Sequence, residues 1–473
     1  MKASGYVVRM FAAGCLLCGI GISATVQAGT NTDWPTFGFN PVRTGAPDVP
    51  MGIAAGDLHS LKRQKVKIDG TVDSSPIYLH GITVTGAKHD VFFVTTTYGK
   101  TLAIDANSGA VLWEFTPPDY PKLKGTYRIT TATPVAGPQR RYIYAAAPDG
   151  VIRKLSVANG DVEWGTAITK LPRREKIASA LSYVNGHVIA VTGGYVGDQP
   201  PYQGHVAILD AKTGSLLHVW NALCSNRHKL MEPSSCKRSD AAIWGRAGAV
   251  IDPATGDIFV ATGNGYWNGK DDWGDSVIEL NPDATKILGN YTPTNTEQLS
   301  KRDLDVGSSS PVLLGKGYVL QGGKDRYLRL LDWTRLKGIK PHRARASFRV
   351  STPNHGMLFT APAVWRHGSV TWIYVADYSG TAAWTFAGGK LHRRWHNSHG
   401  GTSPVVADGL VFVYDPGGWL RVYKPESGRE IGKLACGKGH WNSPIVVDGR
   451  IALPQGNANA HRTSGVLNIW RVR

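Results

Sequence analysis

The sequence is poor in charged side chains and in cysteine, and it lacks several well-known motifs. Only 19% of its 473 residues are charged, and no stretch has the composition of a disordered segment. Beyond the first 28 residues, no apolar run is a candidate to span a membrane. No Gly-x-Ser-x-Gly elbow is present, which argues against Ser-His-Asp hydrolysis. No nucleic-acid-binding signature is found either, so a nucleic-acid partner is not expected.

The first 28 residues have the pattern of a cleaved export signal. Lys2 and Arg9 supply its positive end, residues 10–22 its apolar core, and residues 26–28 the small residues that a signal peptidase reads. The alternative is an uncleaved membrane anchor, for which the apolar run is short. We therefore expect a signal peptide over 1–28, a periplasmic or secreted protein, and no transmembrane segment after cleavage.

Cysteine usage agrees with export. Three cysteines follow the signal, and Cys224 and Cys236 are expected to close a disulfide loop in an oxidising compartment. A loop of that size contributes roughly 3 kcal/mol in the chain-entropy model. Cys436 is left over, and a buried small apolar residue is a more frequent role for such a cysteine than a reactive thiol.

Positive charge exceeds negative charge. The chain has 53 Lys and Arg against 35 Asp and Glu, and loss of the signal removes two of the basic residues. An exported protein of this charge favours anionic surroundings such as lipid headgroups, wall polymers or acidic substrates. Solubility alone is the alternative explanation.

A repeat organises the rest of the chain. Residues 99–109 alternate apolar and polar side chains, turn at a Ser-Gly pair and lead to Trp113; residues 150–164 and 204–220 repeat the pattern. Weaker copies follow toward the C-terminus. Each copy predicts a hairpin whose turn uses the glycine in a left-handed conformation.

Four strands per repeat and eight repeats predict an all-β fold, an eight-bladed β-propeller of four-stranded antiparallel blades. Pro residues at strand starts, such as Pro76 and Pro404, are compatible with a ladder. The predicted strand over 58–69 precedes the first full blade, and the last blade lacks its own fourth strand, so the N-terminal strand is expected to close the ring. The expected boundaries are a lead-in over 29–57 and the propeller over 58–473. A row of separate β-sandwiches is the alternative.

This pattern resembles the PQQ-like (quinoprotein alcohol dehydrogenase-like) propeller superfamily, which includes quinoprotein alcohol dehydrogenases and the outer-membrane assembly scaffold BamB. The lead-in over 33–45 is similar to that of secreted members. The likeness covers essentially the whole chain after the signal and is specific for fold more than for function.

The dehydrogenase branch implies roles for several residues. The stretch 252–264 resembles the strand pair that ends in the metal-binding asparagine, which implies Asn264 as a calcium ligand. Residues 303–305 resemble the segment with the catalytic base, which implies Asp305. Lys324 falls in the motif that contacts the oxygens of the quinone. Trp244 is the candidate for a stacking floor under PQQ, two residues out of register.

Other features depart from the branch. The adjacent Cys-Cys pair that caps the cofactor is missing, and no metal-binding glutamate is evident near Gly204, where Asp198 and Gln199 lie in a Pro-rich loop. A Cys-x-x-Cys-His site is absent, so no haem is expected.

Two further clusters are candidates. His355, His399 and His440 each precede the Pro start of a blade, and three imidazoles converging at the axial mouth, together with Asp305, would form an alternative transition-metal site. Hydrogen bonding to blade edges is the plainer role for them. Arg246 belongs to the same predicted ring and could bind an anion there.

A basic loop is the other candidate. Residues 224–238 carry Arg227, His228, Lys229, Lys237 and Arg238. The loop is either a finger that docks a partner or anion, or a stapled surface loop.

Two functions remain open. The first is a quinoprotein dehydrogenase-like oxidoreductase that oxidises an alcohol or polyol at the propeller axis with PQQ and calcium. The second is a non-catalytic, BamB-like scaffold that binds a protein or an anionic polymer through blade faces and loops.

Overall fold

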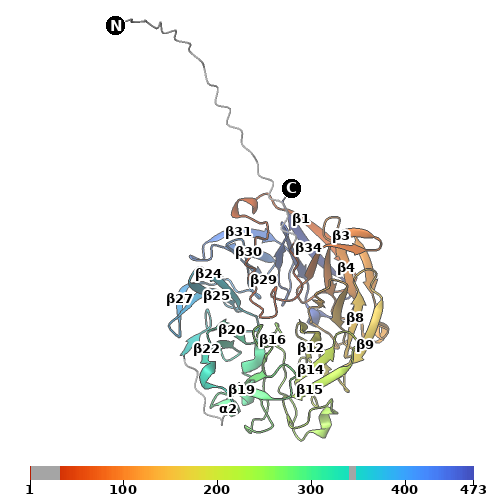
Figure 1. Cartoon of the computed structure of the whole chain (residues 1–473), viewed down its shortest axis with the longest axis vertical. Helices are drawn as coiled ribbons and strands as arrows, with labels where there is room; N and C mark the ends of the chain where they lie inside the picture. Colours follow the sequence, from red (N-terminus) through yellow and green to blue (C-terminus); the bar gives the residue numbers. More distant parts are fainter. Residues whose placement is uncertain (2–31, 340–347, 473) are drawn as a thin grey trace.

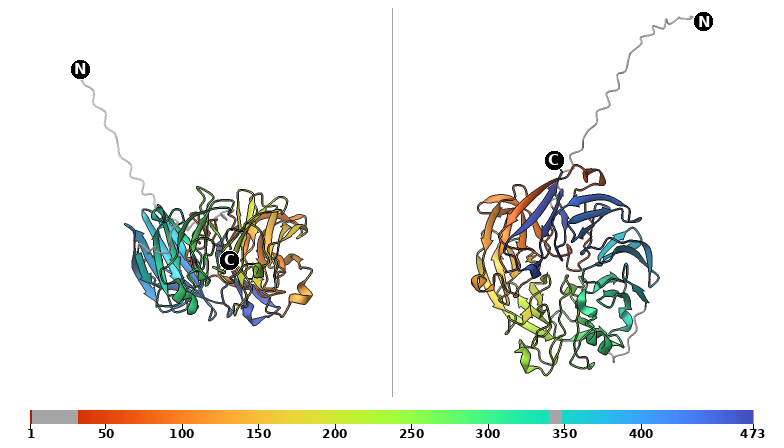
Figure 2. Two further views of the ribbon diagram at one scale, coloured as in Figure 1. Left: turned by 90° about the horizontal axis from the view of Figure 1, so that it is seen from below. Right: turned by 180° about the vertical axis from the view of Figure 1, so that it is seen from behind.

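The computed structural model describes residue 1 and residues 32–339 and 348–472. Apart from Met1, the predicted signal over 1–28 lies outside the described residues. Eight four-stranded antiparallel sheets stand in a ring within the described chain (Figure 1), and the ring forms a disc when seen from the side (Figure 2, left). The predicted eight-bladed propeller is confirmed.

Each blade is numbered in chain order and given from its innermost to its outermost strand. Blades 1 and 2 are β2 (Ile77–Val84), β3 (Ala87–Thr95), β4 (Thr101–Asp105) and β5 (Val111–Phe115), then β6 (Val135–Ala136), β7 (Tyr142–Ala146), β8 (Val151–Ser156) and β9 (Val162–Ala167). Blades 3 and 4 are β11 (Ser182–Val184), β12 (His187–Val191), β14 (His205–Asp210) and β15 (Leu216–Asn221), then β16 (Val250–Ile251), β17 (Ile258–Ala261), β18 (Val277–Leu280) and β19 (Ile287–Tyr291).

Blades 5 and 6 are β20 (Val312–Gly315), β21 (Tyr318–Gly322), β22 (Tyr327–Asp332) and β23 (Phe348–Ser351), then β24 (Ala363–His367), β25 (Val370–Ala376), β26 (Thr381–Ala387) and β27 (Lys390–Asn397). Blades 7 and 8 are β28 (Val405–Ala407), β29 (Leu410–Asp415), β30 (Trp419–Tyr423) and β31 (Glu430–Ala435), then β32 (Ile445–Val447), β33 (Arg450–Gln455), β34 (Gly465–Arg471) and β1 (Lys62–Ile68).

The remaining elements are short. β10 (Glu175–Lys176) and β13 (Gly193–Gly194) form a separate two-stranded sheet beside blade 3. The helices are α1 (Tyr120–Leu123) and α2 (Thr296–Lys301), with single 3₁₀ turns η1 (Ala55–Asp57), η2 (Pro233–Ser235), η3 (Val306–Ser308), η4 (Trp333–Arg335) and η5 (Ala458–Ala460). No helix in the described ranges has the length and apolarity needed to cross a membrane.

The repeat combines glycine and tryptophan for one packing reason. The indole of Trp113 lies against the turn glycine of the next blade, Gly160, where an added Cβ would come within 2.7 Å of the ring. Gly160 has φ 78°, which favours glycine independently. The indole N–H of Trp113 donates to the carbonyl of Val157 at 2.9 Å. Trp164 and Trp395 pack in the same way on Gly214 and Gly428, so these tryptophans join neighbouring blades.

The N-terminal strand closes the ring. β1 pairs antiparallel with β34 along its whole length, with Val66 opposite Leu467. Val66 and Ile68 face inward and belong to the hydrophobic core that blade 8 shares with blades 1 and 7, whereas Lys65 and Lys67 are exposed. The predicted closing strand is therefore confirmed, and it is shorter than expected because residues 58–60 form a turn, in which the N–H groups of Ser60 and Leu61 donate to the carbonyl of Asp57.

The lead-in ties blades together at one end of the axis (Figure 2, right). Backbone carbonyls of Trp34, Thr44 and Gly45 accept hydrogen bonds from the inner strands of blades 1, 6 and 7 at 2.7–2.8 Å. Arg43 is buried and donates to the carbonyl of Leu181 at 2.8 Å and to the hydroxyl of Ser182 at 2.6 Å. Burial lowers the pKa of Arg43 to about 9. One segment thus fastens blades that lie far apart in the sequence.

Replacing Val66 with Asp tests the ring closure. An unpaired carboxylate in the core should lower the free energy of unfolding by at least about 3 kcal/mol. Lys65→Asp places the same side chain on the exposed side of the same strand and should change it by no more than about 0.5 kcal/mol. Urea unfolding followed by tryptophan fluorescence measures both. Equal effects of the two variants would mean that the buried side chains of β1 do not stabilise the closed ring.

Candidate active site on the propeller axis

All eight blades deliver a residue to the axis in the same register. The residue four positions before each inner strand is, in blade order, Asp73, Thr131, Ala178, Arg246, Ser308, Phe359, Gly401 and Trp441. These positions precede the inner strands, whereas the lead-in contacts lie within the strands. The lead-in therefore covers one end of the axis, and this ring of residues lies toward the other.

Arg246 reaches from blade 4 to blade 1. It is 3% exposed, and it donates to the carbonyl of Asp73 at 2.8 Å and to that of Ala178 at 3.3 Å. Its guanidinium lies over the ring of Trp441, 5.3 Å from the centroid. Its Nε is buried without a partner among the described residues. Burial lowers the pKa of Arg246, and Asp73 opposes this effect.

Asp73 is the buried carboxylate beside Arg246. It accepts from Nδ1 of His440 at 2.8 Å and from the backbone N–H groups of Trp441 and Ala458 at 2.8 and 2.9 Å. Burial alone would raise the pKa of Asp73, but its contacts with His440, the charge of Arg246 and a backbone bond lower it overall. Asp73 is therefore ionised at neutral pH.

An aromatic group lines the same space. Trp244 lies 5.9 Å from Phe359 and 6.1 Å from Trp441 between ring centroids, and Phe359 stacks on Trp441 at 6.2 Å with an interplanar angle of 26°. Tyr378 is 51% exposed and lies 5.2 Å from Phe359. Flat apolar faces are thus available next to the charged residues.

The residues implied by the resemblance meet in one place. Asp305, just before η3, forms an ion pair with the ammonium of Lys324 and accepts from the backbone N–H of Asn264 at 2.5 Å. The ammonium of Lys324 also lies 2.5 Å from Asp303 and 5.2 Å from the ring centroid of Trp244. Trp244 reaches the site despite its shifted register.

The charges of this pair are set by burial and by each other. Asp305 is 4% exposed, and burial raises its pKa even though Lys324 and the N–H of Asn264 lower it. Burial would lower the pKa of Lys324, but the carboxylates of Asp305 and Asp303 outweigh it and raise the pKa. Lys324 is therefore a cation at neutral pH, next to a carboxylate with an increased proton affinity.

Asn264 presents an oxygen without a protein donor. Its side-chain amide donates to Asp303 at 2.8 Å, whereas its Oδ1 is buried and has no partner among the described residues. The backbone of Asn264 is held in turn by Ala241, whose N–H donates to its carbonyl at 2.6 Å. Asp240 and Ala241 have φ of 90° and 54°, a conformation that non-glycine residues rarely adopt and that occurs at functional sites.

Asp275 is a buried carboxyl group behind Asp305, and it was not predicted from the sequence. It is fully buried, and its carboxyl accepts from the backbone N–H of Val306 and contacts the hydroxyl of Ser300, both at 3.0 Å. Burial raises the pKa of Asp275 to about 8, and the charge of Asp305 contributes. Asp275 is therefore mostly protonated at neutral pH. Nothing in the local sequence distinguishes it from a turn aspartate.

β10 contributes two more buried ionisable groups that sequence analysis missed. Lys176 is 5% exposed, and burial, reinforced by the charge of Arg246, lowers its pKa to about 8. Glu175 accepts from the backbone N–H of Gln203 at 3.1 Å, and burial raises its pKa to about 7. Two buried cations, Lys176 and Arg246, thus lie near the single carboxylate of Asp73.

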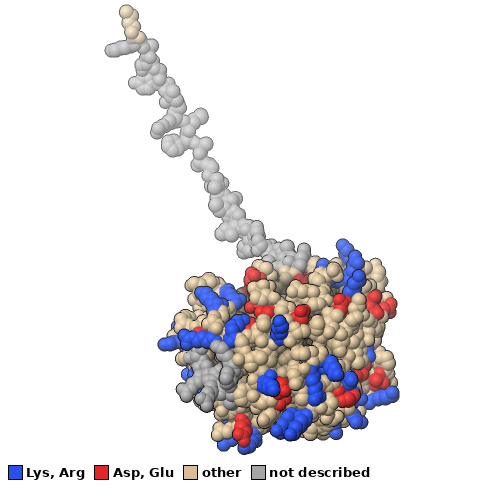
Figure 3. All heavy atoms as spheres, turned by 60° about the horizontal axis from the view of Figure 1, so that its bottom comes forward, with Lys and Arg blue, Asp and Glu red and all other residues tan. Residues whose placement is uncertain are grey.

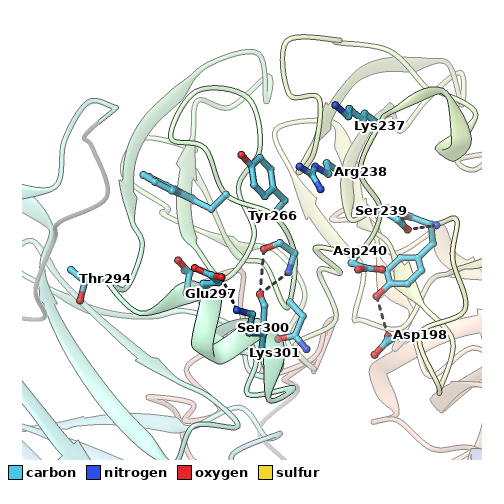
Figure 4. Close-up of a pocket in the computed structure, with 15 residues that line it drawn as sticks. Asp198, Lys237, Arg238, Ser239, Asp240, Tyr266, Thr294, Glu297, Ser300 and Lys301 are labelled. Atoms are coloured by element: carbon cyan, nitrogen blue, oxygen red, sulfur yellow. Dashed lines mark hydrogen bonds and ion pairs between the residues drawn. The ribbon is translucent and has the colours of Figure 1, made fainter.

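A cavity of about 840 Å³ opens beside Asn264 (Figure 4). Tyr266 and the guanidinium of Arg238, which lies 4.1 Å from the centroid of that ring, form one wall. Tyr202 and Asp198 form another wall, and the hydroxyl of Tyr202 donates to Oδ1 of Asp198 at 3.0 Å. The cavity is wide and has both charged and aromatic lining.

The predicted disulfide between Cys224 and Cys236 forms, with Cα atoms 6.2 Å apart. The loop that it closes leads into Lys237 and Arg238, both of which line the cavity. The basic loop is thus a wall of the cavity as well as a surface feature. Cys436 is free and half-buried, and burial raises its pKa to about 12.

The three candidate histidines are not brought together. Among the described residues, the groups of three His, Cys, Asp or Glu whose ligand atoms lie within 4.8 Å of one another do not include His355, His399 or His440. His440 pairs with Asp73, while His355 and His399 are exposed. The group of His80, Asp90 and Asp448 is bridged by Arg450, which supplies the positive charge itself.

Comparisons with known proteins give a match to part of one family model and several distant relatives. The family model described as outer membrane protein assembly factor BamB matches residues 59–266. The dehydrogenase subunit of an alcohol dehydrogenase (quinone) from Acetobacter aceti is 22% identical over 90% of this chain and 65% of its own length. The quinohemoprotein alcohol dehydrogenase ADH IIB of Pseudomonas putida is 26% identical over 54% of this chain and 40% of its own length.

The solved structures agree on the fold. The quinohemoprotein alcohol dehydrogenase from Comamonas testosteroni superposes with a TM-score of 0.70 at 15% identity, over 93% of this chain and 80% of that chain. The chain spans 40 to 65% of the length of the first curated relatives that it matches. In repeat pattern, blade count and ring closure the chain is similar to the PQQ-like β-propellers, and the distant relatives named above have the same likeness.

Proposed function

We propose that the axial site is that of a quinone-dependent dehydrogenase that oxidises an alcohol or polyol. The observation that carries the proposal is the meeting of Asp305, Lys324, Asn264 and Trp244, four residues from four separate stretches of sequence. Their side chains supply a base, a cation, a neutral oxygen and a flat aromatic face. The relatives described as quinone alcohol dehydrogenases support the same reaction class.

The residues present fit a divalent cation. The buried Oδ1 of Asn264 lacks a protein donor, and the carboxylate of Asp305 is adjacent through the backbone of Asn264. Neutral and charged oxygens of this kind are ligands of calcium. Asn264 would hold the ion through its Oδ1, whereas Asp305 is assigned the role of the base. No glutamate is proposed for the ligand set, because the family's position is not evident in this sequence.

The residues also fit a flat anionic quinone. PQQ is a planar tricarboxylate, for which Trp244 offers a stacking face and the buried cations Arg246 and Lys176 offer charge partners. The unpartnered Nε of Arg246 is a free donor for such a carboxylate. When bound, PQQ supplies the two-electron oxidising capacity that the side chains lack.

The chain's own residues handle the proton and the charge. A carboxylate oxygen of Asp305 accepts the hydroxyl proton of the substrate, for which its increased proton affinity is suited. Lys324 stays protonated, and its ammonium stabilises negative charge on a group bound next to it. Asp275 stays neutral below it, so a second carboxylate charge does not oppose ionisation of Asp305.

A binding propeller without catalysis is the second candidate. The missing Cys-Cys pair leaves the face opposite Trp244 without the family's cap, and the match to the BamB model covers residues 59–266. In that function the cavity and the blade faces would bind a protein or an anionic polymer. Export to the periplasm or beyond is proposed for both functions, since the disulfide fits an oxidising compartment.

Binding of PQQ is the first test. The protein is titrated with PQQ in calcium-containing buffer while absorbance and tryptophan fluorescence are followed, and saturation in the micromolar range is expected because Trp244 lies at the site. Trp244→Phe should remove most of the fluorescence change, whereas Trp419→Phe on blade 7 should not. Absence of saturable binding at high micromolar PQQ would refute the dehydrogenase proposal and favour the binding propeller.

Asp305→Asn tests the base. Loss of general-base catalysis should lower dye-linked alcohol oxidation by about 10²–10⁴-fold. Affinity for PQQ should change by less than about threefold, since Asn keeps the acceptor for the N–H of Asn264. Asp303→Asn makes the same substitution at an exposed neighbour that also contacts Lys324, and should keep most activity. Thermal melting checks that both fold; equal activity losses would remove Asp305 from its proposed role.

Asp275→Asn tests the neutral carboxyl. Because the pKa of Asp275 is raised in the folded state, its contribution to stability is fully present below about pH 4 and is lost as pH rises through about 8. The Asn variant keeps the shape and the hydrogen bonds of the side chain but has no proton to lose. The difference in free energy of unfolding, variant minus wild type, should therefore be at least about 2 kcal/mol larger at pH 9 than at pH 5. Asp283→Asn, at an exposed position, should show no such difference. Urea unfolding at the two pH values measures this, and parallel profiles for all three proteins would contradict an unionised Asp275.

A further inference from the structure

Positive charge is divided unequally between the two halves of the ring. The outermost strands of blades 5 to 8, which we call the basic flank, are β23, β27, β31 and β1. They carry nine Lys and Arg and one acidic residue, Glu430; the cations are Lys62, Arg63, Lys65, Lys67, Arg349, Lys390, Arg393, Arg394 and Lys433. The outermost strands of blades 1 to 4 carry no Lys or Arg and two glutamates.

The cations of the basic flank are not neutralised internally. None of the nine forms an ion pair with a carboxylate of the described residues, and eight of them are exposed. Arg63 is partly buried, and its Nε donates to Oδ1 of Asn468 at 2.9 Å. By contrast, Glu430, the one acid of the flank, is already paired with Arg421 at 2.8 Å. The field of the nine cations therefore acts on the surroundings.

Protection of strand edges does not explain this distribution. Charges on outer strands discourage pairing with other chains, and lysine serves this purpose often. The outermost strand of blade 3, β15, is an edge of its sheet as well, yet it contains no Lys, Arg, Asp or Glu at all. β19 of blade 4 is also uncharged, but residues 336–338 bond to its outer edge. A function confined to one side of the disc accounts for the difference.

The strands of the basic flank belong to neighbouring blades. Blades 5 to 8 are consecutive: the outermost strands β23 and β27 contact each other, and blades 6, 7 and 8 contact each other through their inner strands β24, β28 and β32. In Figure 1 the flank follows β27, β31 and β1 along the left and top of the ring; Figure 3 shows Lys and Arg side chains at its left, and further ones along its lower edge and right. The cavity beside Asn264, lined by side chains of both charge signs, belongs to loops of blades 3 and 4 and to the connection that leads into blade 5.

We propose that the basic flank docks the propeller on an anionic lipid surface. The cations spread over four strands of a convex side, and none of them lines one of the described cavities, a distribution that suits a broad headgroup layer better than a single threaded polymer. Trp419 is 37% exposed beneath the ammonium of Lys433, which lies 4.0 Å from the ring centroid. Amphipathic rings beside basic residues are frequent where proteins meet headgroups.

Docking by the flank fixes the orientation of the disc. The outer strands form its side, so the propeller axis would lie parallel to the lipid surface, and neither flat face of the disc would be covered by the membrane. The cavity beside Asn264 would face away from the membrane. Substrate access would then not depend on release from the surface.

Vesicle binding tests the proposal. The purified protein is sedimented with vesicles of 30% phosphatidylglycerol and 70% phosphatidylcholine, and with phosphatidylcholine alone. Binding is expected on the anionic vesicles only, and raising NaCl from 0.05 M to 0.5 M, at which the screening length falls to a few ångströms, should abolish it. A flank variant with Lys65→Glu, Lys67→Glu, Lys390→Glu and Arg393→Glu should lower the partition coefficient at least about tenfold.

A charge-matched variant separates position from net charge. Lys88→Glu, Lys124→Glu, Lys170→Glu and Lys212→Glu change four exposed lysines of blades 1 to 3 by the same total charge and should lower partitioning less than about threefold. Equal losses in both variants would overturn the proposal. So would strong, flank-dependent binding of soluble polyphosphate without vesicle binding, which would identify a polymer partner instead. If the flank variant melts early, the corresponding Gln substitutions replace it, with the same ordering expected.

Discussion

The pairing of β1 with β34 is the contact on which the rest of the molecule depends. Seven blades are each complete within a continuous stretch of sequence, whereas blade 8 takes its outermost strand from the opposite end of the chain. Without this strand the sheet of blade 8 would keep an uncovered edge, and blades 1 and 8 would lose the core that they share through Val66 and Ile68. The lead-in that precedes β1 extends the same fastening across the axis by hydrogen bonds to several inner strands.

Closure is what makes a site out of separate loops. Each blade contributes one residue four positions before its inner strand, and only a closed ring turns these eight residues toward a common axis. Arg246 of blade 4 then meets Asp73 of blade 1, and Trp244 meets Trp441 of blade 8. A site assembled in this way is sensitive to the geometry of the whole ring, because no blade holds more than a part of it.

The sequence predicts the periodic features well, because each has a local cause. Turn glycines and blade-end tryptophans recur because each tryptophan packs on the turn glycine of the next blade. Asn264, Asp305 and Lys324 stand in short stretches of sequence that resemble those of the dehydrogenases. It does not predict features that arise from contacts across the ring. The histidines share a spacing along the chain, yet His440 is paired with Asp73, and His355 and His399 are exposed and belong to no group of converging ligands among the described residues. Asp275, Glu175 and Lys176 look ordinary in sequence, and only burial changes their ionisation.

The charge balance at the axis gives the strongest physical reason to expect an anionic ligand there. Two buried cations, Arg246 and Lys176, have one buried carboxylate nearby, and His440 shares that carboxylate with them. Burying an unmatched cation is unfavourable, and the lowered pKa values of both groups reflect this. A fold under no functional constraint would replace one of them with an apolar residue of similar size. Retaining both is favourable overall if a carboxylate of a bound ligand completes the set, with Nε of Arg246 as its donor.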